Sequence, residues 1–318
     1  MLFNEYEVEI VKVVRTFQKI HLFSTSEEYL RVARVGSWIG WIFSFCFGSI
    51  LLSLPPLHNF ILVLFAFSLA TASIFILNQY FDRKEDQANT FKSSLPVASG
   101  KITPRTALIL SLMLIISCLV LVVFIDTGLA LLFLVYLMFG AAYSAPPFRL
   151  KTVPIVDFIV SGVGGGFMPF LMGLELNGKL GSNISLILLG VVPLMLIHCG
   201  GHIIQAVGDY EIDFKMRVYT FVVKYGKKNG VIVAGILFLS AGFLPLVYSV
   251  FGLLPYEHLL IFFILFPLSM PIIKRYTAVL KKPSSQNVIN MQKTARRYGV
   301  IGATVALCYM ILVNIASI

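Results

Sequence analysis

The sequence predicts an all-α membrane protein with nine transmembrane helices around a central cavity. Three observations support this prediction: hydrophobic residues make up 58% of the 318 residues, charged residues make up only 13%, and the apolar residues come in long blocks. Globular domains usually carry about 25% charged residues, so this chain has too few for an ordinary water-facing surface. The blocks therefore belong in a bilayer, where backbone groups satisfy one another by forming helices.

The nine predicted spans are blocks of about the length that crosses a bilayer. Roughly 20 mostly apolar residues are needed for about 30 Å of hydrocarbon. Several blocks are longer, as expected of helices that tilt or extend past the membrane. The blocks cover residues 35–54, 58–81, 105–125, 128–145, 154–174, 183–208, 229–251, 257–273 and 298–316.

Residues 1–34 precede the first block, and we treat them as a cytoplasmic segment separate from the nine-helix domain at 35–318. Charged residues alternate with apolar ones along this segment. The pattern fits two structures equally well: a helix lying on the membrane surface, or a polar tail leading into the first span.

The basic residues fall in alternate connections between the predicted spans. Of the 25 Lys and Arg residues, 24 lie in the N-terminal segment or in the connections 82–105, 146–153, 209–228 and 274–297, and the other is Lys179. The positive-inside rule places these regions and the N-terminus in the cytoplasm. The net charge of +10 is therefore explained by basic loops that contact anionic lipid and a phosphorylated substrate. We do not expect the chain to bind nucleic acid.

A polar segment ends the second block and reads Asn78-Gln-Tyr-Phe-Asp82-Arg-Lys-Glu-Asp86. Residues spaced by four share one face of a helix, so Asn78, Asp82 and Asp86 form a row of oxygen ligands. Mg²⁺ usually takes one or two carboxylates together with substrate phosphates, and this row suits that task. The alternative is an ordinary polar helix end whose carboxylates pair with Arg83 or Lys84.

A second acidic segment, Asp209-Tyr-Glu211-Ile-Asp213, ends the sixth block. Asp209 and Asp213 again share a helix face, whereas Glu211 points elsewhere on a regular helix. The alternative is a solvated helix end paired with Lys215 and Arg217. Both segments end even-numbered spans, so the charge pattern places them on the same membrane face. Two Mg²⁺ ions held there would stabilise the charge that develops on a leaving diphosphate.

The two segments resemble the signature motifs of the UbiA superfamily of intramembrane prenyltransferases. Leu95-Pro-Val-Ala-Ser-Gly-Lys101 and Tyr143-Ser-Ala-Pro-Pro-Phe-Arg149-Leu-Lys151 resemble two loops of that family, and the resemblance runs from about residue 30 to the end. The sequence departs from the family at Leu95, Arg217 and Val35, where Arg, Gly and Pro are common. The acidic motifs are intact. The resemblance implies nine spans and a multi-pass membrane protein whose active site faces the cytoplasm.

The resemblance also implies roles for individual residues. Asp82, Asp213 and Tyr143 would be catalytic, because an aromatic face can stabilise an allylic cation, although Tyr is also common at membrane interfaces. Metal ligands would be Asn78, Asp82, Asp86, Asp209 and Asp213. Diphosphate would be bound by Arg149 and Lys151, and less directly by Lys101 and Arg34. Four further residues would either contact the acceptor or support the metal ligands: Glu211, Gln205, His202 and Tyr210.

Other polar and small residues of the spans receive structural interpretations. His198 and His202 are expected to line a polar cavity wall, because no third zinc ligand is evident. The glycines at 162–166 are expected to allow close helix packing. Asp157 is a rare acid near the start of a span and is expected to face the cavity. The four cysteines are interpreted as small core residues.

The predicted reaction is the Mg²⁺-dependent transfer of a polyprenyl group from an allylic prenyl diphosphate to a small or lipidic acceptor. An aromatic quinone precursor is the favoured acceptor. A terpene cyclase, an ether-lipid prenyltransferase and a carotenoid prenyltransferase of the same superfamily stay open as alternatives. A cation-coupled transporter is less well supported, because its carboxylates would lie near the bilayer midplane in broken helices.

Overall fold

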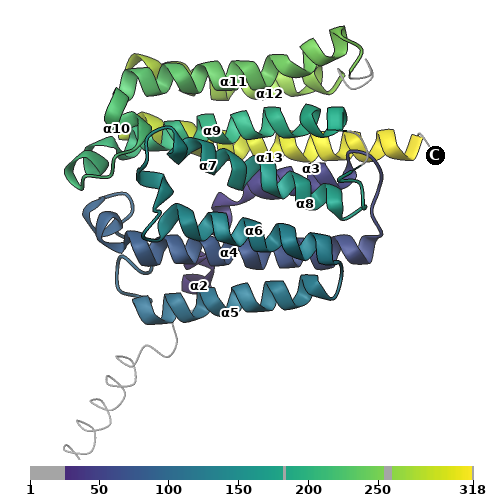
Figure 1. The fold of residues 1–318 in the computed structure, drawn as a ribbon. Helices are drawn as coiled ribbons and strands as arrows, with labels where there is room; N and C mark the ends of the chain where they lie inside the picture. The colour runs from purple at the N-terminus through teal and green to yellow at the C-terminus, as the bar shows by residue number, and fades with distance from the viewer. Residues whose placement is uncertain (1–25, 182–183, 254–259, 317–318) are drawn as a thin grey trace, which may run out of the picture.

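The computed structural model describes residues 26–181, 184–253 and 260–316, so most of the predicted N-terminal surface helix or tail lies outside it. The described residues form helices and connecting turns, with no strand among them. The long helices run side by side along one direction (Figure 1). The predicted all-α membrane fold is confirmed.

Eight helical segments are long and apolar enough to cross a membrane. The fourth of them, which is the fifth span predicted from the sequence, is a composite of α7 (Val156–Gly162), η3 (Val163–Phe167) and α8 (Met168–Glu175). The others are α4 (Leu57–Ala88), α5 (Pro104–Val123), α6 (Thr127–Ser144), α9 (Ile184–Lys215), α11 (Lys227–Val250), α12 (Leu260–Lys281) and α13 (Ser285–Ala316).

The first predicted span is shorter than expected. It contains the turn η1 (Val35–Ser37) and the 12-residue helix α3 (Ile39–Ile50). At 1.5 Å per residue, α3 covers only about 18 Å, which is less than the hydrocarbon thickness. The nine-helix count is therefore approximate. Three other short helices lie in the connections: α2 (Ser26–Val32), η2 (Leu150–Thr152) and α10 (Phe221–Tyr225).

The fifth span is irregular because its glycines pack against α9. Residues Val163–Phe167 form a π-helical turn, and a Cβ atom added to Gly166 would lie 2.7 Å from the backbone nitrogen of Met195. A Cβ atom on Gly165 would collide with the His198 ring. Small residues allow such close approach between membrane helices. This confirms the packing role predicted for the glycine-rich stretch.

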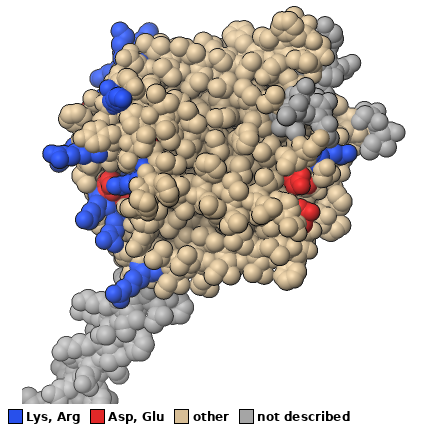
Figure 2. Space-filling model, viewed as in Figure 1, with Lys and Arg blue, Asp and Glu red and all other residues tan. Residues whose placement is uncertain are grey.

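Three helices extend beyond the apolar part of the bundle. α4, α9 and α13 each have 32 residues, which corresponds to about 48 Å. The excess consists of polar residues at the end of α4, at the end of α9 and at the start of α13. On the face drawn in Figure 2, most of the visible Lys and Arg side chains lie at this end of the molecule. We call it the basic end.

The two largest hydrophobic clusters among the described residues each join several helices, and a smaller cluster joins α8 to α9. One large cluster joins α3, α4, α5, α6 and α8 around Phe45, Phe67 and Phe133, which are inaccessible to solvent. The other large cluster joins α9, α10, α11, α12 and α13 around Ile203 and Val231. The polar ends of α4 and α9 come from different large clusters. Any site that contains both ends therefore lies between the two halves of the fold.

Candidate active site

The polar end of α4 presents the first acidic motif on one face, as its spacing predicts. The Asn78 side-chain amide donates to Asp82 Oδ2 at 2.6 Å and to Ser144 Oγ, at the end of α6, at 3.1 Å. Asp82 and Asp86 are each only 7% exposed. Two carboxylates are thus withdrawn from bulk water at the end of a helix that reaches past the membrane.

The connection after α6 supplies cations to this motif. Lys151 Nζ forms an ion pair with Asp82, and Arg149 Nη2 lies 2.5 Å from Glu85 Oε1 and 3.6 Å from Asp82 Oδ1. Arg149 adopts φ +40°, in the left-handed region, at the turn that begins η2. The structure therefore brings Arg149 and Lys151 to the first motif. In the described residues, no ion pair joins Asp82 or Asp86 to Arg83 or Lys84, the alternative partners.

The second motif meets the loop that follows the first one. Asn89 donates to Asp209 Oδ1 at 3.0 Å, and Lys92 Nζ lies 2.7 Å from Asp209 Oδ2. Asn89 and Lys92 directly follow α4, so these contacts hold the ends of α4 and α9 together. Sequence reasoning missed both residues. Asn89 and Asp209 are 120 positions apart, and no spacing rule connects them.

Lys92 is held in its charged form by the two motifs. Burial alone lowers the pKa of this ammonium group, but the nearby carboxylates of Asp209 and Asp86 raise the pKa by more than burial lowers it. The net effect raises the pKa of Lys92 above its ordinary value. Lys92 is therefore a permanent positive charge between the two acidic motifs.

Asp213 belongs to the same cluster. It interacts electrostatically with Asp209 and with Asp82 of the first motif, and with the cations Lys92 and Lys151. The chain turns back directly after it, where the Val218 amide donates to the Asp213 carbonyl at 2.8 Å. We refer to Asn78, Asp82, Asp86, Asp209 and Asp213, with Lys92, Arg149 and Lys151, as the carboxylate cluster.

Tyr143 and His202 lie next to each other beside this cluster. Their rings are edge-on, with centroids 6.1 Å apart, and His202 Nε2 lies 4.0 Å from Asp157 Oδ2. Tyr143 also interacts electrostatically with Asp82 and with the second motif. Gln205, one turn before Asp209, is half-buried. The structure thus places Tyr143 and His202 beside the carboxylate cluster, and Gln205 one helical turn before Asp209 on α9.

Asp157 is turned toward the loop that follows the second motif. Its side chain is inaccessible to solvent, and Oδ2 accepts the backbone N–H of Phe221, the first residue of α10, at 2.8 Å. Asp157 therefore fixes the 216–226 connection. In this connection Arg217 adopts φ +57°, a conformation that favours glycine. That geometry explains why a glycine suits this position.

Three predicted site residues are not brought to the cluster. Glu211 is exposed and pairs with Lys227 at 2.5 Å, while Tyr210 stacks on Phe214 and lies under the same ammonium group. Adjacent residues point about 100° apart on a helix, so neither shares the face of Asp209. Lys101 instead pairs with Glu28 of α2 at 2.5 Å.

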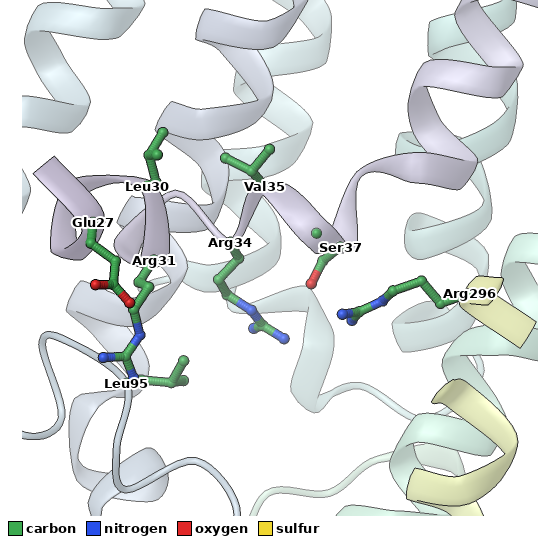
Figure 3. Close-up of a pocket in the computed structure, with 9 residues that line it drawn as sticks. Glu27, Leu30, Arg31, Arg34, Val35, Ser37, Leu95 and Arg296 are labelled. Carbon is green, nitrogen blue, oxygen red and sulfur yellow. The ribbon is translucent and has the colours of Figure 1, made fainter. Parts of the chain in front are cut away.

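Arg34 lies at a second cationic site near the cluster. A cavity of about 460 Å³ between α2, η1 and α13 is lined by three cations, Arg31, Arg34 and Arg296, and by one carboxylate, that of Glu27. Figure 3 shows the Arg34 and Arg296 guanidinium groups directed toward the same space. Arg34 also interacts electrostatically with Asp86 and Lys92. The cavity is thus a place for an anion next to the carboxylate cluster.

The ligand chemistry of the cluster fits Mg²⁺ that arrives with a phosphorylated substrate. Among the described residues, no group of three or more His, Cys, Asp or Glu side chains is arranged to hold a metal ion alone. Mg²⁺ in phosphate sites needs only one or two carboxylates per ion, because phosphate oxygens and water complete its shell. Two carboxylate pairs and one amide fit two such ions. Lys92, Arg149 and Lys151 fit the remaining phosphate oxygens.

Comparison with known sequences gives a family and several relatives. The model of the UbiA prenyltransferase family matches residues 41–314. A 2-acyl-4-prenylphloroglucinol 6-prenyltransferase from Humulus lupulus is 30% identical over 210 residues, which cover 61% of this chain and 50% of that protein. Digeranylgeranylglyceryl phosphate synthase from Methanocaldococcus jannaschii is 29% identical over 264 residues, covering 82% of this chain and 85% of that protein. The chain thus spans about half the length of the Humulus lupulus relative.

Solved structures show the same fold. A UbiA homologue from Archaeoglobus fulgidus, bound to GPP and Mg²⁺, superposes with a TM-score of 0.70 at 22% identity, covering 90% of this chain and 99% of that one. A homologue from Aeropyrum pernix K1 superposes with a TM-score of 0.68 at 16% identity, covering 86% of this chain and 97% of that one.

Proposed function

This chain belongs to the UbiA prenyltransferase family, and we propose that it transfers a prenyl group from an allylic prenyl diphosphate to an acceptor, with Mg²⁺ as cofactor. One observation carries the proposal: the acidic ends of α4 and α9 meet around Lys92, with Arg149 and Lys151 beside them. Anion-binding cations and carboxylates suited to hard metal ions are needed together where a diphosphate is cleaved. The Archaeoglobus fulgidus homologue was solved with both GPP and Mg²⁺, which supports this substrate class.

Each group of the cluster has a part in the proposed reaction. Asn78, Asp82 and Asp86 would hold one Mg²⁺ ion, and Asp209 and Asp213 a second. Bound Mg²⁺ would neutralise the charge that builds on the leaving diphosphate. Arg149, Lys151 and Lys92 would bind phosphate oxygens. Arg34 would share this role from the neighbouring cavity.

The carbon chemistry would take place on the Tyr143 side of the cluster. The bond between the prenyl carbon and the diphosphate oxygen breaks, and the Tyr143 ring face stabilises the allylic cation. The acceptor then forms a bond to that carbon and loses a proton. The prenyl chain would lie among the apolar helices, on the membrane side of the cluster. Gln205 and His202 would face the acceptor.

The acceptor we favour is an aromatic ring. The Humulus lupulus relative is named for a phloroglucinol, and another relative, from Oryza sativa, is named a probable homogentisate phytyltransferase. A second candidate is a prenylated glyceryl phosphate, because the cavity lined by Arg31, Arg34 and Arg296 suits a phosphate group. The relative from Methanocaldococcus jannaschii supports this second candidate through its name and its coverage.

The arrangement of the acids argues against a cation-coupled transporter. In the described residues, every Asp and Glu lies at or near a helix end or in a connection. Transporter sites instead place ion ligands near the bilayer midplane, in broken helices. We further propose that the basic end, and with it the carboxylate cluster, faces the cytoplasm.

The experiment that tests the function follows diphosphate release from purified protein. Prenyl diphosphates of several chain lengths are combined with Mg²⁺ and with either an aromatic acid or geranylgeranylglyceryl phosphate as acceptor. We expect Mg²⁺-dependent release with one of the acceptors. We expect Asp82→Asn and Asp213→Asn each to lower the rate by about a hundredfold, because each removes the negative charge of a metal ligand.

The control for these variants is Glu175→Gln, which makes a comparable charge change at the opposite end of the bundle. It should keep the wild-type rate. If no prenyl diphosphate gives Mg²⁺-dependent release with any acceptor, the proposed function is wrong. If the wild type shows Mg²⁺-dependent release and the two Asp variants are equally active, the proposed reaction stands but the assignment of the metal ligands is wrong.

A further inference from the structure

A second pocket, separate from the carboxylate cluster, lies between α12 and α13 near the basic end. Its volume is about 480 Å³, and all of its lining residues in the described part of the chain come from these two helices. The side chains that give it its character are two cations from each helix, a hydroxyl and an aromatic ring: Lys274, Arg275, Lys293, Arg297, Thr294 and Tyr298. We call it the α12–α13 pocket.

The charge in this pocket is not balanced by the protein around it. Residues 260–316 contain seven Lys and Arg residues and no Asp or Glu. Within the described part of the chain, none of the four pocket cations forms an ion pair with a carboxylate. All four are exposed. Four clustered positive charges without a protein counter-ion repel one another, so the pocket favours an anion from outside.

The position of the pocket along the membrane normal indicates which anion it would bind. The long apolar stretch of α12 ends at Ile273, immediately before Lys274, and that of α13 begins at Val300, shortly after Arg297. The pocket therefore lies at the level where the helices pass from hydrocarbon to water. This level is occupied by the phosphate groups of the bilayer, and basic pockets between helices bind such groups.

The surface on the hydrocarbon side of the pocket suits acyl chains. α12 and α13 are the least buried spans, with 6% and 11% of their apolar windows inside the protein. Phe266, Met270 and Ile273 on α12, and Val300 and Ile301 on α13, are exposed. A lipid whose head group occupied the pocket would lay its chains against these side chains.

We propose that the α12–α13 pocket binds the phosphate head group of an anionic phospholipid of the bilayer. Lys274, Arg275, Lys293 and Arg297 surround the phosphate, and Tyr298 lies at the interface beneath the Arg297 guanidinium group, 5.9 Å from ring centroid to guanidinium carbon. Among the described residues, the pocket has no acidic side chain to hold Mg²⁺ and no lining from α4, α6 or α9. It is therefore distinct from the proposed diphosphate site.

Lipid binding is measured by native mass spectrometry of the full-length protein released from detergent. The probes are phosphatidylglycerol and phosphatidylcholine with the same acyl chains. The test variant is Arg275→Gln/Arg297→Gln. Its matched control is Lys281→Gln/Lys282→Gln, which removes two exposed cations of the same hairpin outside the pocket. Thermal unfolding shows that each variant is folded, and Lys274→Gln/Lys293→Gln replaces the test variant if it is not.

We expect phosphatidylglycerol to bind in preference to phosphatidylcholine, and the test variant to bind it about twentyfold more weakly, because each cation near the surface contributes a factor of about five. The control variant should bind phosphatidylglycerol as the wild type does. Equal binding of the two lipids, or an equal loss in both variants, would overturn the proposal. Displacement of phosphatidylglycerol by millimolar inorganic phosphate would also overturn it, because the ligand would then be a free phosphate.

Discussion

Asp209 is held by Asn89 and Lys92, both from the loop that follows the first acidic motif. The Lys92–Asp209 ion pair is mostly buried, with 25% and 17% of the two side chains exposed. Lys92→Met removes the cation and leaves Asp209 with only the Asn89 amide in this loop. We expect a loss of about 2 kcal/mol in the free energy of unfolding, the usual range for a hydrogen bond to a charged group. We also expect a raised KM for prenyl diphosphate. Thermal unfolding and steady-state kinetics measure both effects.

The pH dependence of this effect follows from the raised pKa of Lys92. A raised lysine pKa in the folded state stabilises the protein fully below the ordinary lysine pKa of about 10.4, and this stability is lost only as pH rises through the folded value. The stability that Lys92 contributes relative to Lys92→Met should therefore still be present at pH 9. Lys92→Arg, which keeps the charge, should retain most of the stability. A difference that disappears by pH 8 would show that the pair does not stabilise the fold.

The two acidic motifs could be predicted from sequence, whereas the residues that join them could not. Asn78, Asp82 and Asp86 share a face because the helix repeats every 3.6 residues, and this regularity is local. Lys92 lies in an irregular loop, and its partner is 117 positions away. Glu28 likewise withdraws Lys101 from its predicted role, although nothing in the spacing of the two residues indicates that they meet. Contacts that depend on the tertiary fold leave no periodic signal.

At the scale of the helices, the contact between α3 and α8 depends on glycine. A Cβ atom on Gly173 would collide with the carbonyl oxygen of Phe45 and lie 2.7 Å from the nitrogen of Ser49, both backbone atoms of α3. Backbone atoms cannot turn away, so α3 and α8 must separate in Gly173→Ala. We expect a loss of about 1–3 kcal/mol in stability, as for overpacked cores. Thermal unfolding in detergent measures it.

The control for this prediction is Gly242→Ala on α11. No atom lies within 4 Å of the Cβ position there, and the residue is inside a helix. Alanine is the better helix former, so this variant should be as stable as the wild type or up to about 1 kcal/mol more stable. Equal unfolding temperatures for the two variants would contradict the close packing of α3 and α8.

The start of α10 is held by the Thr220 hydroxyl, which accepts the Val223 N–H, and by the buried carboxylate of Asp157. Asp157→Ala removes the acceptor for the Phe221 N–H, and the connection that follows Asp213 should become mobile. We expect faster hydrogen exchange at residues 216–226 and an increase of about tenfold in the Mg²⁺ concentration needed for half-maximal activity, as for residues that support metal ligands. Exchange measured by mass spectrometry and a Mg²⁺ titration test the two effects.

The matched control is Asp126→Ala at the start of α6. Asp126 accepts the Leu129 N–H at 2.7 Å, so this variant also loses a carboxylate cap, at a similar cost of about 1 kcal/mol. It lies at the end of the bundle opposite to the carboxylate cluster. Its Mg²⁺ requirement should not change. If both variants shift the Mg²⁺ requirement equally, the effect is one of general stability.

The sequence predicts which segments are helical better than it predicts where a helix is short or distorted. The long apolar blocks are enough to indicate α4, α5 and α6, because a bilayer allows few other structures. The shortness of α3 and the π-helical turn at 163–167 depend on packing against α8 and α9. Hydropathy does not contain that information. The irregular fifth span could be suspected only from its glycines.

At the scale of the whole molecule, the segregation of Lys and Arg predicts that the basic end faces the cytoplasm. In a variant without the native cysteines, a single cysteine replaces His58, exposed at the opposite end, or Gln286, exposed at the basic end. Intact cells are treated with a membrane-impermeant maleimide. We expect His58→Cys to react and Gln286→Cys to react only after permeabilisation. The reverse labelling pattern would place the carboxylate cluster outside the cell.

The extra length of α4, α9 and α13 has a consequence for how the proposed reaction ends. It places the cleaved bond where two solvents, water and hydrocarbon, adjoin. The diphosphate ion is soluble only in the first, and the prenylated product is soluble mainly in the second. Each would leave by partitioning into its own phase, and neither would have to cross the other. Turnover would then need no opening through the membrane and no source of work beyond the difference in solubility of its products.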